Sequence, residues 1–226
     1  MDAHELVLTL SRKLKNHATE ENVIPMQAYM RDQFPFHGIK SEARKAVTKN
    51  FYNEHKQVLV PQVREFAMAC FEQPYRELHY SAQELLQRVQ KDKWLQSDFD
   101  YLCYLALKHP WWDTIDFIAK HLLGNYFTLH TRDKKRQIAW LNAHGSLWLN
   151  RSAILHQLAY KQDTDEELLY ECCRYHMKDP EFFIQKAIGW SLREYAKVNP
   201  ESVVQFVTRH ETEMSKLAYR EATKHL

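Results

Sequence analysis

The chain has 226 residues, of which 45% are hydrophobic, 13% aromatic and 27% charged. That length suits one domain with a sizeable apolar core, and we expect a single domain over residues 1–226. Only four glycines occur, far fewer than the roughly 7% that is usual in proteins. Such glycine poverty argues against a doubly wound nucleotide-binding fold, which needs glycine-rich turns, and against a barrel of many hairpins.

Charge and cysteine usage narrow the class of protein further. Lys and Arg outnumber Asp and Glu by 31 to 29, so any nucleic-acid-binding surface must come from how the cations are arranged. The cysteines lack metal-ligand spacing and indicate reduced core thiols of a cytoplasmic protein; they are Cys70, Cys103, Cys172 and Cys173. No P-loop or metalloprotease signature occurs, and no apolar run approaches the ~20 residues of a membrane span. We expect no metal ion, no small-molecule cofactor and no membrane partner.

Signals for helices recur along the whole chain. Ser97 precedes apolar residues at helical spacing, and Thr164 opens a capping-box pattern. Asp179-Pro180 and Asn199-Pro200 each place an N-cap residue before a proline. We therefore predict a short C-terminal helix and helices over residues 3–17, 20–33, 41–56, 61–73, 76–91, 97–108, 112–123, 132–143, 146–161, 165–177, 180–198 and 201–213.

The lengths of these helices and of their connections predict an architecture. Helices of this length with short connections favour antiparallel pairs of roughly 35–40 residues each, the period of helical solenoids. The prediction is an all-α fold, a curved solenoid of HEAT-like antiparallel helix pairs with a concave face. The pairs do not resemble one another in sequence, so an irregular all-helical globule is the alternative.

The predicted helix 180–198 carries a face that does not suit a plain solenoid. An aromatic residue and three cations recur there at i, i+4, i+7 and i+11: Lys186, Trp190, Arg193 and Lys197. Cations beside an aromatic ring suit a phosphate backbone with a base or sugar over the ring. The alternative is that Trp190 packs on a neighbouring helix while the long basic side chains cover it.

Two further segments contain acidic and basic residues in unusual positions. Trp112 and Asp116 share one helix face if a helix begins at Trp112. The alternative makes Asp113 an N-cap and Asp116 a first-turn carboxylate that the helix dipole stabilises. Arg151 lies on a largely apolar helix face and cannot lose its charge, so it needs a carboxylate or phosphate partner. Asp116 is one partner among many acids, and a surface-facing Arg151 is the other possibility.

A basic run opens the predicted helix 132–143. It consists of Arg132, Lys134, Lys135 and Arg136. Cations in a first turn oppose the helix dipole slightly, which favours a phosphate-contacting role over a stabilising one. A plain solvated face is the alternative.

Four segments together resemble the AlkD-like DNA alkylation repair family. They are residues 28–31 (AYMR), 111–116 (WWDTID), 150–155 (NRSAIL) and 182–195 (FFIQKAIGWSLREY), in the family's order and approximate spacing. The resemblance covers nearly the whole chain. It implies a curved stack of HEAT-like repeats whose concave basic face holds duplex DNA.

The resemblance also implies an activity and the residues that perform it. The activity is that of a monofunctional glycosylase, which hydrolyses the N-glycosidic bond of purines alkylated at N3 or N7 while the base stays largely stacked. Residue by residue, the family's tryptophans, aspartate and arginine match Trp112, Trp190, Asp116 and Arg151. A DNA-facing tyrosine matches Tyr29. The implied phosphate contacts are Lys186, Arg193 and Lys197, together with Lys134, Lys135 and Arg136 of the basic run.

This sparse set of residues suits the implied chemistry. Ordinary glycoside hydrolysis uses two carboxyl groups, one of which protonates the leaving group. A cationic purine leaves as a neutral base without an acid, so Asp116 alone can stabilise the oxocarbenium-like sugar and position a water. Arg151 would hold Asp116 in place and keep it ionised, and could bind a flanking phosphate. Trp112 and Trp190 would line the deoxyribose.

Two other functions stay open on the sequence: a HEAT-like module that binds damaged or branched DNA without chemistry, and a protein-interaction solenoid. The expected partner is double-stranded DNA containing alkylated purines, bound by a monomer in the cytoplasm and, when on DNA, at the nucleoid. The near-neutral charge predicts that cations gather on the concave face and acids lie mostly elsewhere. Gly189, within a predicted helix, predicts a close approach by backbone or DNA, because a mid-helix glycine costs about 1 kcal/mol.

Overall fold

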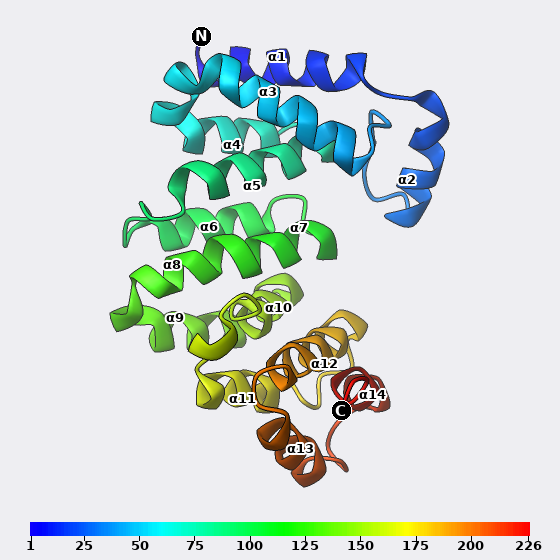
Figure 1. Cartoon of the computed structure of the whole chain (residues 1–226), viewed down its shortest axis with the longest axis vertical. Helices are drawn as coiled ribbons and strands as arrows, with labels where there is room; N and C mark the ends of the chain where they lie inside the picture. Colours follow the sequence, from blue (N-terminus) through cyan, green and yellow to red (C-terminus); the bar gives the residue numbers. More distant parts are fainter. The chain divides into compact units, whose positions relative to one another are not determined.

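The computed structural model describes all 226 residues, and every regular element in it is a helix. The prediction of an all-α fold is therefore confirmed. No helix is long and apolar enough to cross a membrane. The helices belong to two compact units, Met1–Lys93 and Trp94–Leu226 (Figure 1). The single domain and the curved form of the array stay predictions.

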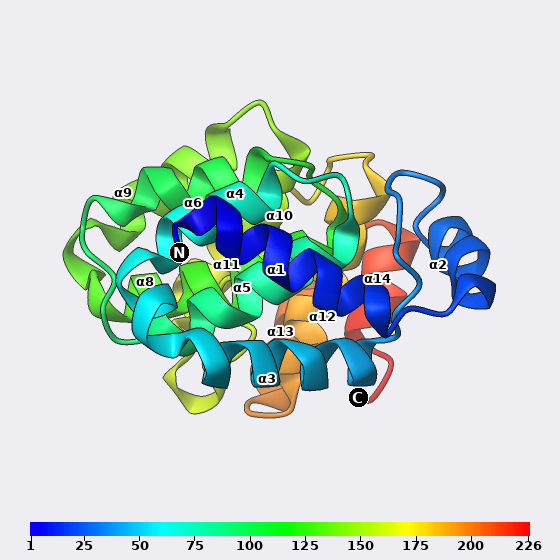
Figure 2. The ribbon, with the colours of Figure 1, turned by 90° about the horizontal axis from the view of Figure 1, so that it is seen from above.

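The N-terminal unit contains five α-helices and two 3₁₀ turns. The helices are α1 (Ala3–Asn16), α2 (Val23–Tyr29), α3 (Ser41–Leu59), α4 (Val63–Phe71) and α5 (Arg76–Gln90), and the turns are η1 (Glu20–Asn22) and η2 (Val60–Gln62). Helices α1 and α3 lie side by side (Figure 2). Leu10, Phe51 and Phe66 are fully buried in the core of this unit. The long amphipathic helices thus form where the sequence predicts them, and α3 runs three residues beyond its predicted end.

The C-terminal unit holds the remaining elements. They are α6 (Asp98–Leu107), α7 (Trp112–Phe117), the π-helical segment η3 (Ile118–Leu123), α8 (Gly124–Leu129), α9 (Thr131–Ala143), α10 (Leu147–Leu155), the 3₁₀ turn η4 (Lys161–Asp163), α11 (Glu166–Tyr175), α12 (Phe182–Ala196), α13 (Pro200–Arg209) and α14 (Lys216–Ala222). Helix α7, the π segment and α8 follow one another without a break. The helix predicted over 112–123 therefore continues to Leu129.

One predicted helix start in this unit is confirmed and another is displaced. Asn199 caps α13, where its side chain accepts a hydrogen bond from the backbone N–H of Ser202 at 3.2 Å. The N-cap predicted at Asp179 is wrong. Its carboxylate instead accepts from the N–H of Glu181, two residues on, which is an Asx-turn. This turn delays the start of α12 to Phe182.

One other predicted cap also differs. Helix α11 is capped by Asp165, which accepts from the N–H of Leu168 at 3.1 Å, and not by Thr164. Asp165 stands three residues before that N–H, the spacing that an N-cap side chain needs. Ser97 does occupy the N-cap position of α6, but its side chain makes no capping hydrogen bond.

Gly189 lets α14 pack directly on α12. A Cβ atom at this position would lie 2.5 Å from the Cβ of Glu221 and 2.8 Å from the carbonyl oxygen of Ala218. Only a residue without a side chain permits this separation. The close approach predicted for Gly189 is therefore made by another helix of the same unit.

We expect Gly189→Ala to destabilise the protein. In an unobstructed helix this change adds about 1 kcal/mol of stability, but here the new methyl group meets the backbone of α14. Overpacking of this kind lowers the free energy of unfolding by about 1–3 kcal/mol, which urea denaturation measures. Gly145→Ala is the matched control, because nothing lies within 4 Å of its added Cβ. A Gly189→Ala variant as stable as the wild type would contradict the packing.

Candidate active site

A bidentate ion pair joins α7 to α10 in the C-terminal unit. Nε of Arg151 donates to Oδ1 of Asp116 at 2.8 Å, and Nη2 donates to Oδ2 at 3.0 Å. Nη1 donates to the backbone carbonyl of Phe183 on α12. One arginine therefore connects three helices. Among the acids that could have paired with Arg151, its partner in the structure is Asp116.

The position of Arg151 follows from the local sequence of α10. Ser146 caps the helix, and the side chain of Asn150 donates to backbone carbonyls at the end of α9. Every residue from Leu149 to Leu155 is buried, and Arg151 is only 4% exposed. A guanidinium so placed is largely shielded from bulk water, and burying it without a partner would cost several kcal/mol. The carboxylate of Asp116 is thus required by the burial of Arg151.

Burial has the largest influence on the protonation of Asp116. It raises the pKa of this carboxyl above its usual value. The charge and hydrogen bonds of Arg151 lower the pKa, and the nearby charge of Asp113 adds a smaller rise. The net direction is upward, and Arg151 acts in the expected direction by lowering the pKa. Arg151 limits the effect of desolvation and does not reverse it.

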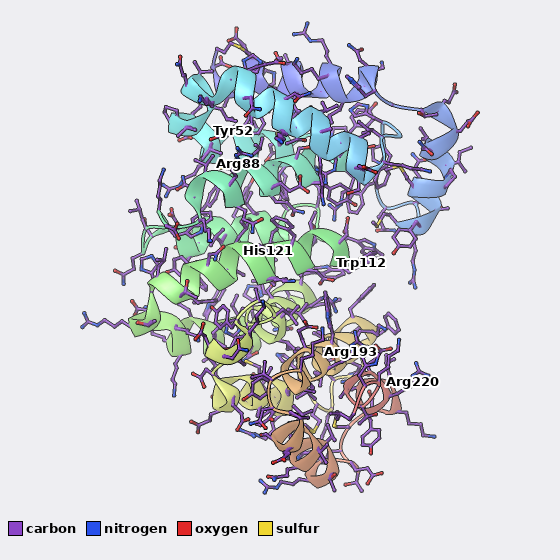
Figure 3. All side chains as sticks on the ribbon, in the orientation of Figure 1. Tyr52, Arg88, Trp112, His121, Arg193 and Arg220 are labelled. Carbon is purple, nitrogen blue, oxygen red and sulfur yellow. The ribbon has the colours of Figure 1, made fainter.

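Helix α7 places Trp112 and Asp116 on one face, at i and i+4. The N-cap position is Trp111, whose backbone is extended at φ −157° and ψ 158°. Asp113 therefore lies in the first turn and is not the N-cap, which removes one of the two alternatives for this segment. Trp112 stands at the beginning of α7 (Figure 3). Beyond Asp116 the helix widens into the π segment, a rare geometry that is frequent at functional sites.

Three aromatic rings pack together beside Arg151. The ring centroids of Trp111 lie 5.6 Å from those of Trp148 and 5.4 Å from those of Phe183, and Trp148 lies 5.2 Å from Phe183. The guanidinium carbon of Arg151 is 6.0 Å from the centroid of Phe183. This cluster was not predicted from the sequence, although Trp111 directly precedes Trp112. The cluster contributes to the burial of the arginine.

Trp190 lies two turns along α12 from Phe183, the residue whose carbonyl accepts from Arg151. Its side chain is half-buried, and it forms no hydrogen bond and no ring contact with another residue. The contact of its indole with DNA therefore stays a prediction.

The cations around Trp190 are already paired within the protein. Nζ of Lys186 lies 3.0 Å from Oε1 of Glu221, and Nη1 of Arg193 lies 2.6 Å from Oε2 of the same carboxylate. Their hydrogen bonds hold the pKa of Glu221 below its usual value. Nζ of Lys197 lies 2.7 Å from Glu194. The expectation that acids lie mostly away from the predicted DNA-binding cations is therefore wrong for this stripe.

The basic run opens α9, as predicted, but no contact joins it to the Asp116–Arg151 pair. Nζ of Lys134 lies 5.3 Å from the ring centroid of Tyr160, and burial lowers the pKa of this lysine. Its neighbours Arg132, Lys135 and Arg136 are exposed, and Arg136 pairs with Asp133 at 3.0 Å.

Tyr29, the tyrosine that the resemblance matches to a DNA-facing residue, ends α2 in the N-terminal unit. Its side chain is 69% exposed, and no residue of this short helix is buried. The structure thus leaves Tyr29 at a surface, and its role stays a prediction.

A pocket of about 320 Å³ lies between the π segment, α10 and α12. Lys120, one turn beyond Asp116 on the same helix, lines it together with Ser191 and Lys197. No three His, Cys, Asp or Glu side chains gather in an arrangement that could hold a metal ion.

Fold and site together define an all-α protein in which one buried carboxylate–guanidinium pair lies on helices that also present two tryptophans. The chain belongs to the DNA alkylation repair enzyme family, whose model matches residues 10–226. It is similar to the solved structure of a predicted DNA alkylation repair enzyme from Enterococcus faecalis, at 31% sequence identity, with 93% of this chain and 97% of that chain covered and a TM-score of 0.83. No curated protein matches. The protein thus acts in DNA repair, with DNA as its substrate.

We expect Arg151→Ala to cost about 3–5 kcal/mol of stability near pH 7, because it leaves a buried carboxylate without its partner. Without Arg151 the pKa of Asp116 rises further, so the folded variant takes up a proton at a higher pH than the unfolded chain. The difference in the free energy of unfolding between the wild type and Arg151→Ala should therefore become smaller as the pH falls and Asp116 is protonated. Urea denaturation at pH 7 and pH 5 measures both effects.

Asp116→Asn supplies the second arm of a double-mutant cycle with Arg151→Ala. The two losses should fail to add by about 1 kcal/mol or more, because each substitution removes the same interaction. Additive losses that are equal at both pH values would show that the pair does not couple the helices.

Proposed function

We propose that the protein is a monofunctional DNA glycosylase that hydrolyses the N-glycosidic bond of cationic N3- or N7-alkylated purines in duplex DNA. The observation that carries this proposal is the single carboxylate of Asp116, held in a bidentate pair by the buried Arg151. Membership of a DNA alkylation repair family supports it. The enzyme would act as a monomer and without a cofactor, and the whole chain would form one domain curved around the DNA.

The reaction needs few catalytic groups because the alkylated purine is already a cation. When the C1′–N bond breaks, its electron pair stays with the purine, which leaves as a neutral base and needs no general acid. Positive charge then develops on the sugar, where the carboxylate of Asp116 stabilises it. Water adds to C1′ and its proton passes to Asp116. A carboxyl group whose pKa is raised by burial accepts that proton more readily than an ordinary aspartate.

Arg151 in this proposal positions the carboxylate. Three of its five N–H donors are used, by the two oxygens of Asp116 and the carbonyl of Phe183. These bonds fix the plane of the carboxylate before substrate arrives, so no reorganisation is needed as charge develops. The two remaining donors are available for the phosphate that flanks the lesion.

Trp112 and Trp190 would lie against the deoxyribose and the lesion. Their π faces attract a cationic purine and the positive sugar. Trp190 suits this role because its ring is only half-buried and is not engaged by a hydrogen bond or by another aromatic ring. Most glycosylases extrude the base into a pocket, whereas here the base would stay largely stacked while the protein holds the backbone.

The phosphate contacts proposed on α12 involve an exchange of partners. A phosphate that approaches Lys186 and Arg193 must replace the carboxylate of Glu221, which now binds both. Because the contacts of Glu221 with Lys186 and Arg193 are lost in this exchange, a phosphate that does not reach these cations well adds little to the affinity for DNA. The other proposed contacts are Lys197, Tyr29, Lys134, Lys135 and Arg136.

The decisive test is base release from a duplex that contains one N7-methylguanine. The wild type should yield free base and abasic sites above the spontaneous rate. Asp116→Asn should lower turnover about 10²–10³-fold, because a neutral amide neither stabilises the sugar cation nor accepts a proton. Binding of the same duplex should change by less than about threefold, an amount worth under 1 kcal/mol.

Asp113→Asn is the matched control, since this acid lies on the same helix but outside the ion pair. It should keep most of the activity. Equal losses of binding and turnover in Asp116→Asn would point to a structural role for that residue. Binding of damaged or branched DNA with no base release by the wild type would favour the non-catalytic module instead.

A further inference from the structure

The N-terminal unit contains a basic groove between α3 and α5. Its volume is about 320 Å³, and its cationic and aromatic lining consists of Lys45, Lys49, Tyr52, Arg88 and Lys91. We call it the α3–α5 groove. None of these residues belongs to the site built around Asp116.

The lining of the α3–α5 groove repeats a pattern seen on α12. On α3, three lysines and one aromatic residue recur at i, i+4, i+7 and i+11: Lys45, Lys49, Tyr52 and Lys56. The stripe around Trp190 on α12 has the same spacing. Residues at this spacing share one face of a helix. Both units therefore present an aromatic ring within a row of cations.

The two stripes differ in how their charge is compensated. On α12 every cation has a carboxylate partner, whereas Lys45, Lys49 and Lys91 are exposed and form no ion pair. The one acid that lines the groove is Glu84. Both of its oxygens accept hydrogen bonds from the buried Arg44, at 2.7 and 2.8 Å. The groove therefore keeps an unbalanced positive charge.

Arg88 is held in a defined orientation at the edge of the groove. Its guanidinium carbon lies over the ring of Tyr52, 4.1 Å from the centroid. Both residues are labelled in Figure 3. Arg88 has no carboxylate partner. A stacked guanidinium loses less conformational freedom when it binds, and its planar set of donors matches the oxygens of a phosphate.

The distribution of charge along the chain points to the same unit. The N-terminal unit has 14 basic and 12 acidic residues, whereas the C-terminal unit has 17 of each. The whole net charge of +2 thus lies in the unit that contains the groove. The side chains that form no ion pair make this excess available to a partner.

We propose that the α3–α5 groove binds successive phosphates of a nucleic-acid backbone and anchors the DNA duplex. Lys45 and Lys49 stand one helical turn apart, about 5–6 Å between their Cβ atoms. From Lys45 in the groove to Lys56, which lies one turn beyond Tyr52 and outside the groove lining, the row extends roughly 16 Å along α3. One small anion cannot contact so long a row, whereas a chain of phosphates can. The choice of duplex DNA as the ligand rests on the function proposed above.

The double variant Lys45→Gln/Lys49→Gln tests this assignment. Binding of an undamaged, fluorescein-labelled duplex of 20 base pairs is followed by anisotropy between 50 and 200 mM NaCl. Each lost phosphate contact should reduce the slope of log K against log salt by about 0.9, so we expect a decrease of about 2. At 100 mM NaCl the affinity should fall about tenfold. Urea denaturation confirms that the variant is folded.

Arg12→Gln/Lys15→Gln is the matched control. It removes two exposed cations from one helix of the same unit, and neither residue lines the groove. Its affinity should stay within about twofold of the wild type, since it loses only long-range attraction. Because the duplex carries no lesion, the result does not depend on base release, and failure of the proposed glycosylase activity would be seen separately.

Three results would overturn the proposal. The first is a groove variant with the salt slope and affinity of the wild type. The second is an equal loss in the control variant, which would mean that total charge and not the groove determines binding. The third is saturable binding of inorganic phosphate that the groove variant abolishes while its DNA binding is unchanged, which would make the groove a site for a small anion.

Discussion

The buried guanidinium of Arg151 is the constraint on which the arrangement of the site depends. It cannot lose its proton, so every element around it must supply an acceptor. Asp116 supplies a carboxylate from α7 and Phe183 supplies a carbonyl from α12. Three helices are thereby fixed relative to one another by a single side chain. The same bonds leave a carboxylate oriented, partly desolvated and 15% exposed, as a group that acts on a bound cation must be.

Charge compensation explains how a nearly neutral protein can act on DNA. Gly189 brings α14 against α12 and so places Glu221 between Lys186 and Arg193. The cations of the stripe on α12 are therefore balanced within the protein, which favours a stable fold without phosphate. In the α3–α5 groove, by contrast, Lys45, Lys49 and Lys91 are exposed and form no ion pair. The two stripes thus have the same residue spacing, but only the cations on α12 are paired with carboxylates.

Sequence reasoning predicted most of the fold because helices are specified by local periodicity and punctuation. Arg151 could also be singled out, since a charge on an apolar face demands a partner wherever that partner lies. The contact of Glu221 with Arg193 could not be predicted, because it joins residues 28 positions apart through the packing of two helices. The α3–α5 groove was missed for a similar reason: Arg88 reaches Tyr52 only when α5 lies against α3. Two caps were predicted wrongly: the neighbouring Asp165 takes the place of Thr164 at the start of α11, and Asp179 accepts a hydrogen bond within an Asx-turn before α12 begins.

The pH dependence of single-turnover base release from N7-methylguanine DNA tests the central role of Asp116 most directly. Burial raises the pKa of this carboxyl. In the proposed mechanism only its ionised form stabilises the sugar cation and accepts a proton. The rate, corrected for spontaneous release, should therefore rise with pH through a midpoint above about 3.9, the ordinary value for aspartate. It should then stay level to pH 8, because a cationic base needs no acid. A rate that is flat from pH 4 upward, or that falls above neutrality, would contradict this account.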